Sequence, residues 1–279
     1  MRYDFYYRLL SIAACILSTT LAGAQPSPLP MPPSDHTTIV VSHRGDHTQT
    51  PENTLAAFAN AIKAGADYVE IDLRTTVDSQ LVIMHDASVD RMTNGSGLVK
   101  NMTGQALQAL KVKDKKHPEW GEYDIPTFDQ VLELCKNRIH IYLDFKNADP
   151  AVAFKEIVRY GMQQQVIVYI NAPQQFIQWR SVAPNMPLMV SLPDTIKDTV
   201  ALVTFLNRVH PDILDGDYDQ YSDDMVNTAK RLGYTVLPDI QGPGENPALW
   251  ATVLKKGFAG LQTDHPGALV AYLQQQHLR

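Results

Sequence analysis

The chain has 279 residues, of which 44% are hydrophobic and 19% are charged, a composition that can bury a large core and is not that of a disordered chain. Its formal net charge of −6 provides no basic surface for nucleic acid. If such a protein handles an anionic substrate, positive charge must be concentrated locally, on a metal ion or on a few Arg and Lys side chains.

The first 24 residues have the pattern of a secretory signal peptide. Arg2 and Arg8 precede an apolar run at 9–23, and Ala22-Gly23-Ala24 supplies the small residues for cleavage before Gln25. The run is shorter than the roughly 20 apolar residues of a membrane span, so we predict no stable span. We therefore expect export, to the periplasm or out of the cell.

The two cysteines predict no disulfide in the mature chain. Cleavage before Gln25 removes Cys15, which leaves Cys135 as a free thiol that we expect in the core. The residues Ile12-Ala13-Ala14-Cys15 also match a lipoprotein processing site. That is the weaker alternative, because apolar sequence continues past Cys15.

Strand and helix patterns alternate through the rest of the chain. Residues 25–36 hold five prolines and predict an extended tether, so the folded domain is 37–279. Short apolar or β-branched runs predict strands at 38–43, 67–73, 138–145, 166–170, 188–192, 212–216, 234–238 and 258–263. Helical patterns lie between nearly all of them, for example at 53–65, 126–137, 198–209 and 222–233. Such repeated alternation over about 240 residues predicts an α/β fold, the (β/α)8 TIM barrel.

The apolar run at 81–86 does not fit this alternation. Only the residues TTVDSQ separate it from the strand at 67–73, too few for the crossover between parallel neighbours. We predict an antiparallel hairpin extension after the second strand, with His85 roughly opposite Glu70.

Polar residues gather at the carboxyl ends of the predicted strands, where the active sites of such barrels lie. In chain order they are His43, Arg44, Glu70, Asp72, His85, Asp144, Lys146, Asp215, Asp239 and Asp264. Because side chains alternate along a strand, Glu70 and Asp72 share one face of their strand.

Three of these acids predict a metal site. Glu70, Asp72 and Asp144 form an all-oxygen set suited to a hard divalent cation, Mg²⁺ or Ca²⁺. The set lacks cysteine and histidine, which disfavours zinc. The alternative is that Glu70 and Asp72 are ordinary strand-end acids paired with Arg74 or Lys146.

His43 and His85 converge on these acids in the predicted barrel. Imidazoles titrate near neutrality, so one ring can remove a proton from an attacking hydroxyl while the other protonates a leaving alkoxide. Arg44 and a cation would offset the charge of a phosphoryl group. The set predicts phosphodiester cleavage, although either histidine alone is also compatible with a hydrogen-bonded core or rim position.

The turn after the first strand has a mechanical explanation. Gly45 relaxes the backbone, Pro51 presets a turn, and Asn53 or Thr54 is placed to cap the next helix. Glu52 has two interpretations. It either complements the helix N-terminus or reaches into the pocket to orient a histidine or Arg44.

Several motifs occur in the order typical of a known family. They are HRG (43–45), PENT (51–54), GADYVEIDLRTTVDSQLVIMHDASVDRMTNGSG (65–97), IPTF (125–128), LDFK (143–146) and GLQTDHP (260–266). In this combination the chain resembles the glycerophosphodiester phosphodiesterase family over nearly its whole mature length. The resemblance implies a TIM-barrel enzyme that uses a divalent metal to hydrolyse glycerophosphodiesters to glycerol 3-phosphate and an alcohol.

The resemblance also implies residue roles. By position, the acid/base pair is His43 and His85, and the metal ligands are Glu70 and Asp72. Arg44 and Lys146 are phosphate contacts, and Glu52 is a further pocket residue. Two positions depart from the family pattern. Asp144 stands where the family usually has Glu, and YTVLPDI (234–240) replaces a W-T-V-N-like run, so the headgroup-facing side of the pocket is expected to differ.

Two other functions are compatible with the same motifs. Related barrels expel the alcohol by attack of a neighbouring substrate hydroxyl, form a cyclic phosphate, and act on lysophospholipids. A non-catalytic binding barrel is the second alternative, although the matched set of acids and histidines argues against it.

Overall fold

A computed structural model describes residues 27–279 of the chain, so the predicted signal peptide at 1–24 lies outside the described residues. Within residues 27–279, no helix combines the length and the apolar composition that a membrane crossing requires.

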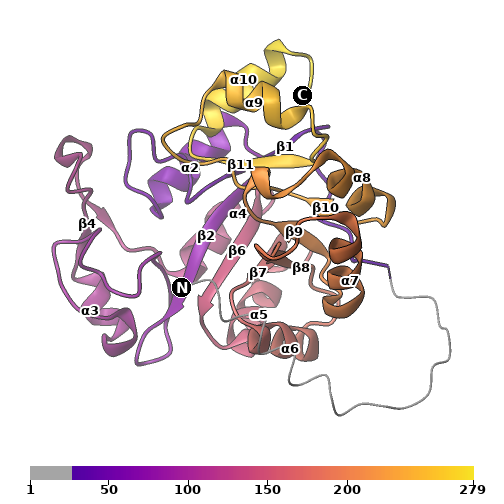
Figure 1. Cartoon of the computed structure of the whole chain (residues 1–279). Helices are drawn as coiled ribbons and strands as arrows, with labels where there is room; N and C mark the ends of the chain where they lie inside the picture. The colour runs from indigo at the N-terminus through magenta and orange to yellow at the C-terminus, as the bar shows by residue number, and fades with distance from the viewer. Residues whose placement is uncertain (1–26) are drawn as a thin grey trace.

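Eight parallel strands form a nearly closed barrel (Figure 1). They are β1 (Ile39–Ser42), β2 (Tyr68–Thr75), β6 (His140–Asn147), β7 (Val166–Ile170), β8 (Leu188–Ser191), β9 (Ile213–Asp215), β10 (Thr235–Val236) and β11 (Gly260–Thr263). Neighbouring strands pair in the order β10-β9-β8-β7-β6-β2-β1-β11. Just beyond β10 the ring closes, because the N–H of Ile240 donates to the Gln262 carbonyl at 3.0 Å. The predicted (β/α)8 barrel is confirmed.

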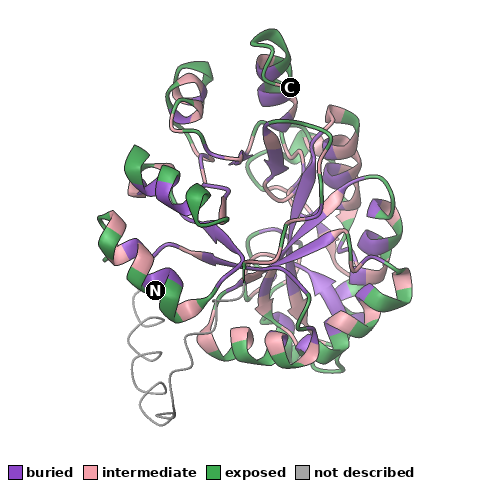
Figure 2. Ribbon diagram, turned by 90° about the vertical axis from the view of Figure 1, so that its right-hand side faces the viewer, coloured by how far each residue is buried: buried purple, intermediate pink, exposed green. Residues whose placement is uncertain are grey.

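Helices surround the barrel. They are α2 (Leu55–Ala64), α4 (Phe128–Cys135), α5 (Pro150–Tyr160), α6 (Pro173–Val182), α7 (Thr199–Val209), α8 (Asp223–Arg231), α9 (Pro247–Leu254) and α10 (Pro266–Gln275). Their buried residues face the strands and their exposed residues face outward (Figure 2). Cys135 ends α4 as a fully buried free thiol, as expected, and burial raises its pKa to about 12.

The inside of the barrel is layered, because alternate residues of each strand point inward. A buried apolar layer consists of Val41, Tyr68, Tyr142, Ile167, Met189, Ile213 and Leu237. Two residues further toward the carboxyl ends, the inward-facing positions become polar and include Glu70, Asp144, Tyr169, Ser191, Asp215 and Asp239. The apolar layer therefore forms a floor, and the polar layer above it lines the mouth of the barrel.

A separate lobe follows the second strand. β3 (Leu81–Ile83) pairs antiparallel with β2, with Leu73 opposite Ile83. The Met84 N–H still donates to the Asp72 carbonyl at 2.9 Å, and His85 follows directly after this last contact with β2. Residues 86–125 then leave the barrel and contain η2 (Val99–Asn101), α3 (Gly104–Gln108), β4 (Lys111–Val112), η3 (Pro118–Trp120) and β5 (Tyr123–Asp124).

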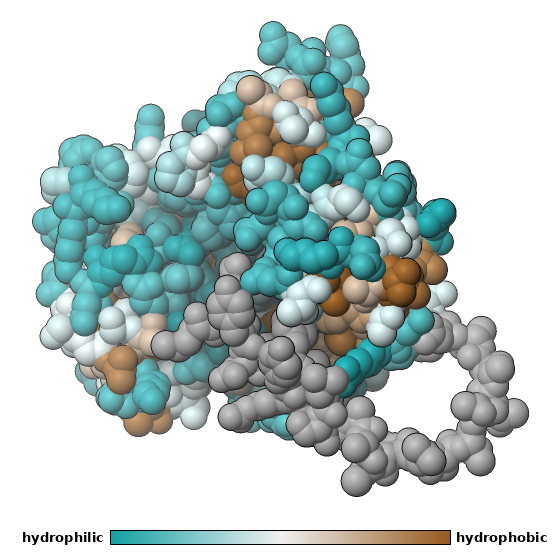
Figure 3. All heavy atoms as spheres, viewed as in Figure 1, coloured by the Kyte–Doolittle hydropathy of each residue, from teal (hydrophilic) through white to brown (hydrophobic). Residues whose placement is uncertain are grey.

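The lobe has a small apolar core of its own, to which β3 contributes Val82 and the lobe itself contributes residues such as Val89, Leu107 and Ile125. In Figure 3, which has the same view as Figure 1, hydrophilic residues dominate the left side of the molecule, where the lobe lies. The lobe begins directly after His85, so its first residues border the barrel mouth.

The described part of the predicted tether packs against the opposite, N-terminal end of the barrel. The Tyr68 hydroxyl donates to the Pro32 carbonyl at 2.7 Å, and His140 Nε2 lies 2.9 Å from the Pro33 carbonyl oxygen. The Leu29 N–H donates to Asp212 at 2.8 Å. These contacts cover the barrel end that lies away from the polar mouth.

Candidate active site

Three carboxylates meet at the carboxyl ends of β2 and β6. Glu70, Asp72 and Asp144 each offer one oxygen, and these oxygens all lie within 4.8 Å of one another. The strand register explains the cluster, because Asp72 pairs with Asp144 on the neighbouring strand and Glu70 lies two residues earlier on the same face as Asp72. The structure therefore brings the three predicted metal ligands together.

Two cations border these acids. The Lys146 ammonium forms ion pairs with Asp144 and, at 3.0 Å, with Asp72. Arg44 Nε lies 3.6 Å from Asp72 Oδ2, and the backbone N–H of Arg44 donates to Glu70 Oε2 at 2.8 Å. Arg74 does not pair with the cluster, because its guanidinium donates to the carbonyls of Met84 and His85.

The surroundings shift the pKa values of Glu70 and Asp72 in opposite directions. Burial, followed by the charges of Asp72 and Asp144, raises the pKa of Glu70 well above its ordinary value. Burial also opposes the ionisation of Asp72, but Lys146 and Arg44 outweigh it and lower the pKa of Asp72 to about 2. A cation among the oxygens would favour the ionised form of Glu70, so the donor set fits a hard divalent ion.

The turn after β1 positions Arg44 and Asp72. Arg44 and Asn53 adopt left-handed backbone conformations, with φ of 53° and 55°, and the Asn53 N–H donates to the Arg44 carbonyl at 3.0 Å. Asn53 Nδ2 then donates to Asp72 at 2.6 Å, while Thr54 caps α2 by accepting from the Ala57 N–H. Asn53 therefore holds a cluster acid, and Thr54 performs the predicted capping.

Gly45 is required at this turn for steric reasons. Its φ is +82°, and a Cβ at this position would lie 2.7 Å from the Ala57 backbone carbon. Any side chain would push α2 away from β1. The glycine thus allows the helix to approach closely enough for Asn53 to reach Asp72.

Glu52 reaches toward the pocket, which decides between its two interpretations. Its carboxylate accepts from Arg44 at 3.1 Å and from Arg91 of the lobe at 2.6 Å. Burial raises the pKa of Glu52, but the hydrogen bond from Arg91 and the charge of Arg44 lower it on balance. Glu52 is therefore an ionised carboxylate that orients Arg44.

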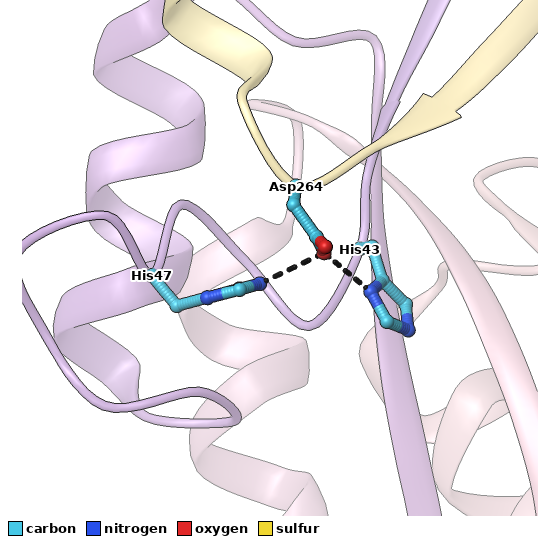
Figure 4. A group of neighbouring side chains, drawn as sticks. All are labelled: His43, His47 and Asp264. Atoms are coloured by element: carbon cyan, nitrogen blue, oxygen red, sulfur yellow. Dashed lines mark hydrogen bonds and ion pairs between the residues drawn. The ribbon is translucent and has the colours of Figure 1, made fainter. Parts of the chain in front are cut away.

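His43 is bound to a carboxylate that follows β11. Its Nδ1 lies 2.7 Å from Asp264 Oδ1, and His47 Nε2 lies 3.1 Å from the same oxygen (Figure 4). Burial opposes the charge of Asp264, but the hydrogen bonds to both imidazoles lower its pKa. An ionised carboxylate only accepts, so the Nδ1 of His43 donates the proton, and the other ring nitrogen points away from Asp264.

His85 has an equivalent partner. Its Nδ1 lies 2.7 Å from Asp86 Oδ1, and its carbonyl is held by Arg74. Burial opposes the ionisation of Asp86, but the hydrogen bonds from Arg91 and His85 lower its pKa to about 2. His85 is close enough to Asp72 for its charge to lower the pKa of that carboxyl. Nδ1 of each predicted catalytic imidazole is therefore anchored by an acid.

Several contributors to the site carried no assigned role in the sequence analysis. They are His47, Arg91, Asp264, Asn53 as an Asp72 partner, and Asn171, which donates to Asp144 at 2.6 Å. Barrel closure gives the signal for Asp264, because β11 pairs with β1 and so ends beside His43. Arg91 lies in a lobe whose placement no strand pattern indicates.

Comparisons with known proteins point to one family. The model of the glycerophosphoryl diester phosphodiesterase family matches residues 43–268. A Bacillus subtilis protein, provisionally named a glycerophosphodiester phosphodiesterase, is 37% identical over 157 residues, 56% of this chain and 64% of that protein. A glycerophosphodiester phosphodiesterase of Caldanaerobacter subterraneus is 28% identical over 84% of this chain and 96% of its own.

The fold comparison points the same way. The crystal structure of a glycerophosphodiester phosphodiesterase from Agrobacterium tumefaciens superposes with a TM-score of 0.76 at 26% identity, covering 84% of this chain and 99% of that one. These relatives, which match most of this chain, are enzymes with the same TIM-barrel fold, and the protein is therefore a TIM-barrel enzyme. The family match spans most of the chain, and the chain therefore belongs to the glycerophosphoryl diester phosphodiesterase family.

Proposed function

We propose that this protein hydrolyses glycerophosphodiesters to glycerol 3-phosphate and an alcohol by acid/base catalysis with His43 and His85. The observation that carries the proposal is that two imidazoles, each with Nδ1 against an ionised carboxylate, follow strands β1 and β3, both of which pair with the strand β2 that carries Glu70 and Asp72. Family membership supplies the substrate class.

The anchored imidazoles suit proton transfer. Because Nδ1 of each ring faces Asp264 or Asp86, Nε2 is the nitrogen left for the substrate. One imidazole takes the proton of the attacking water, and the other donates its proton to the oxygen of the departing alcohol. In this way, the P–O bond to the alcohol breaks as the bond to the water oxygen forms, and the alcohol leaves neutral.

We further propose that Glu70, Asp72 and Asp144 hold one divalent cation, Mg²⁺ or Ca²⁺. Such an ion neutralises charge on phosphoryl oxygens when it is bound. Arg44 and Lys146 lie beside these acids and would add donors for the phosphate group. Asn53 and Asn171 orient Asp72 and Asp144 and so keep the oxygens convergent.

Product analysis tests this reaction against its alternatives. We expect ³¹P NMR of the purified protein with a glycerophosphodiester to show glycerol 3-phosphate appearing as the diester disappears. A persistent cyclic phosphate would show instead that a hydroxyl of the substrate, and not water, attacks the phosphorus. Absence of turnover with every glycerophosphodiester and lysolipid tested, while such ligands still bind, would support a binding barrel instead.

We also propose that the protein is exported, from the signal-peptide pattern at 1–24. Mass spectrometry of the protein from its native host should find a mature chain that begins at Gln25. A lipid-modified chain that begins at Cys15, and that the substitution Cys15→Ala abolishes, would establish the lipoprotein alternative. An unprocessed chain in the cytoplasm would contradict both.

A further inference from the structure

A second acidic group lies across the barrel from the three-acid cluster. Asp215 ends β9, and Asp239 follows β10. Around the closed ring, β1 and β11 lie between β2 and β10. Asp239 bridges to Gln262 of β11, and its N–H donates to the carbonyl of Gly216, the residue after Asp215, at 2.9 Å, so the two acids and Gln262 are neighbours. The proposed mechanism uses none of these three residues.

The two acids interact directly with one another and lack a cation. Burial, followed by the charge of Asp239, raises the pKa of Asp215 well above its ordinary value. Within residues 27–279, no ion pair includes either acid. Burial and the neighbouring carboxylate of Asp239 therefore both disfavour the ionised form of Asp215.

Two buried acceptors beside this pair have no hydrogen-bond partner. Gln262 is 4% exposed, and its Nε2 donates to Asp239 Oδ1 at 2.5 Å, which leaves Oε1 without a donor among the described residues. Asp215 is 3% exposed, and Oδ1 is likewise unpartnered there, although Oδ2 accepts from Tyr142. Buried polar atoms are normally hydrogen-bonded, so this group is short of donors.

The group can be reached from the mouth and borders the catalytic acids. Asp239, Ser191 and Tyr169 are half-buried, whereas Asp215 and Gln262 lie behind them. The Tyr169 and Ser191 hydroxyls are 2.7 Å apart, and Tyr169 pairs with Asp144 on the adjacent strand. A ligand whose phosphate lies at the three-acid cluster would extend along these hydroxyls toward Asp239.

We propose that Asp239, supported by Asp215 and Gln262, is a specificity site for the alcohol portion of the diester, and that it selects alcohols with N–H or O–H donors. The inference rests on the proposed function, since it assigns a pocket for that substrate. Primary ammonium and polyol groups supply the missing donors. A quaternary ammonium has no N–H or O–H donor and so cannot satisfy these acceptors.

Measurement of kcat/KM on three substrates tests the proposal. Wild-type protein should prefer glycerophosphoethanolamine and glycerophosphoglycerol over glycerophosphocholine. Asp239→Asn keeps the shape and removes the charge, so it should lower the preference for the ethanolamine ester by roughly 10-fold to 100-fold, the value of a charge-assisted hydrogen bond. A smaller loss for the glycerol ester than for the ethanolamine ester would identify the ammonium as the group selected.

Two further variants keep the test decisive. Asp219→Asn makes the same change at an exposed acid, and the substrate preference should not change. Ser191→Ala removes a hydroxyl that lies between the three-acid cluster and Asp239. It should shift the substrate preference in the same direction as Asp239→Asn. Thermal melting should show Asp239→Asn no less stable than wild type, because it removes repulsion between buried acids.

The possible failures can be separated. If the wild type turns over all three esters and Asp239→Asn lowers them equally or leaves their ratios unchanged, the specificity site is wrong while the proposed function stands. If the wild type turns over no glycerophosphodiester, the proposed function is wrong and the inference falls with it.

Discussion

His43 and His85 share one arrangement, in which Nδ1 lies 2.7 Å from a carboxylate oxygen of Asp264 or Asp86. The two carboxylates come from different places in the chain, one after β11 and the other next to its histidine. Both fix the protonated nitrogen and the ring orientation. At the scale of single residues, the account therefore depends on Nε2 of each ring being free to exchange a proton with substrate.

Replacement of His43 by Ala should remove one of the two proton-transfer groups. We expect kcat to fall by about 100-fold or more, the usual contribution of a general acid or base. Steady-state kinetics measure the loss, and His117→Ala, at an exposed imidazole of the lobe, serves as the matched control. A His43→Ala protein that is folded and retains full turnover would exclude His43 as the acid or base.

Asp264→Asn tests whether the carboxylate positions His43. The substitution preserves size but weakens the acceptor for Nδ1–H, so we expect at least about a 10-fold loss in kcat with little change in KM. His47→Ala leaves the bond between His43 and Asp264 intact, and a loss as large as that of Asp264→Asn would contradict this assignment.

At the scale of elements, the connection between β1 and α2 does most to assemble the site. It presents His43 toward Asp264, Arg44 toward Asp72, and Glu52 toward Arg44 and Arg91. Its left-handed residues and its glycine make these contacts possible over a short stretch. The strand ends of β2 and β6 provide the acids by register alone.

The N-terminal end of the barrel depends on another acid, Asp67. Its carboxylate accepts from Arg279 at 2.5 Å, from Ser34 at 2.6 Å and from the Val40 N–H at 2.7 Å. Burial raises the pKa of Asp67, but these hydrogen bonds outweigh it and lower the pKa on balance. This acid joins the N-terminal segment, β1 and the C-terminus.

Asp67→Asn should therefore lower the free energy of unfolding at pH 7 by about 3 kcal/mol, because the buried Arg279 loses its partner. A lowered folded-state pKa stabilises above the unfolded value near 3.8, and this contribution disappears as the pH falls through the folded-state pKa. Denaturant unfolding should show a smaller difference in unfolding free energy between Asp67→Asn and wild type at acid pH than at pH 7. A difference independent of pH would contradict the assignment, and Asp35→Asn, at an exposed acid, should have little effect.

At the scale of the whole molecule, the barrel was predictable because strands and helices alternate with few interruptions. The acids were predictable too, since alternation and parallel register bring Glu70, Asp72 and Asp144 together. The lobe was not, because its strands are two residues long and its core is small. Arg91 and its bonds to Glu52 consequently escaped the sequence analysis.

The partners of the site residues were harder to predict than the residues themselves. Asp264 approaches His43 only because the ring closes and places β11 beside β1. Asn53 has the residue type of a helix cap, yet Thr54 caps and Asn53 bonds Asp72. Such choices depend on three-dimensional packing, which a linear pattern does not contain.

The central claim is that one divalent cation, held by Glu70, Asp72 and Asp144, works with the two imidazoles in hydrolysis. Turnover of glycerophosphoethanolamine after removal of metal with EDTA tests it most directly. We predict that turnover falls to background and returns when Mg²⁺ or Ca²⁺ is added in excess, and that Asp72→Asn prevents the recovery. Undiminished turnover in the metal-free protein would contradict the account.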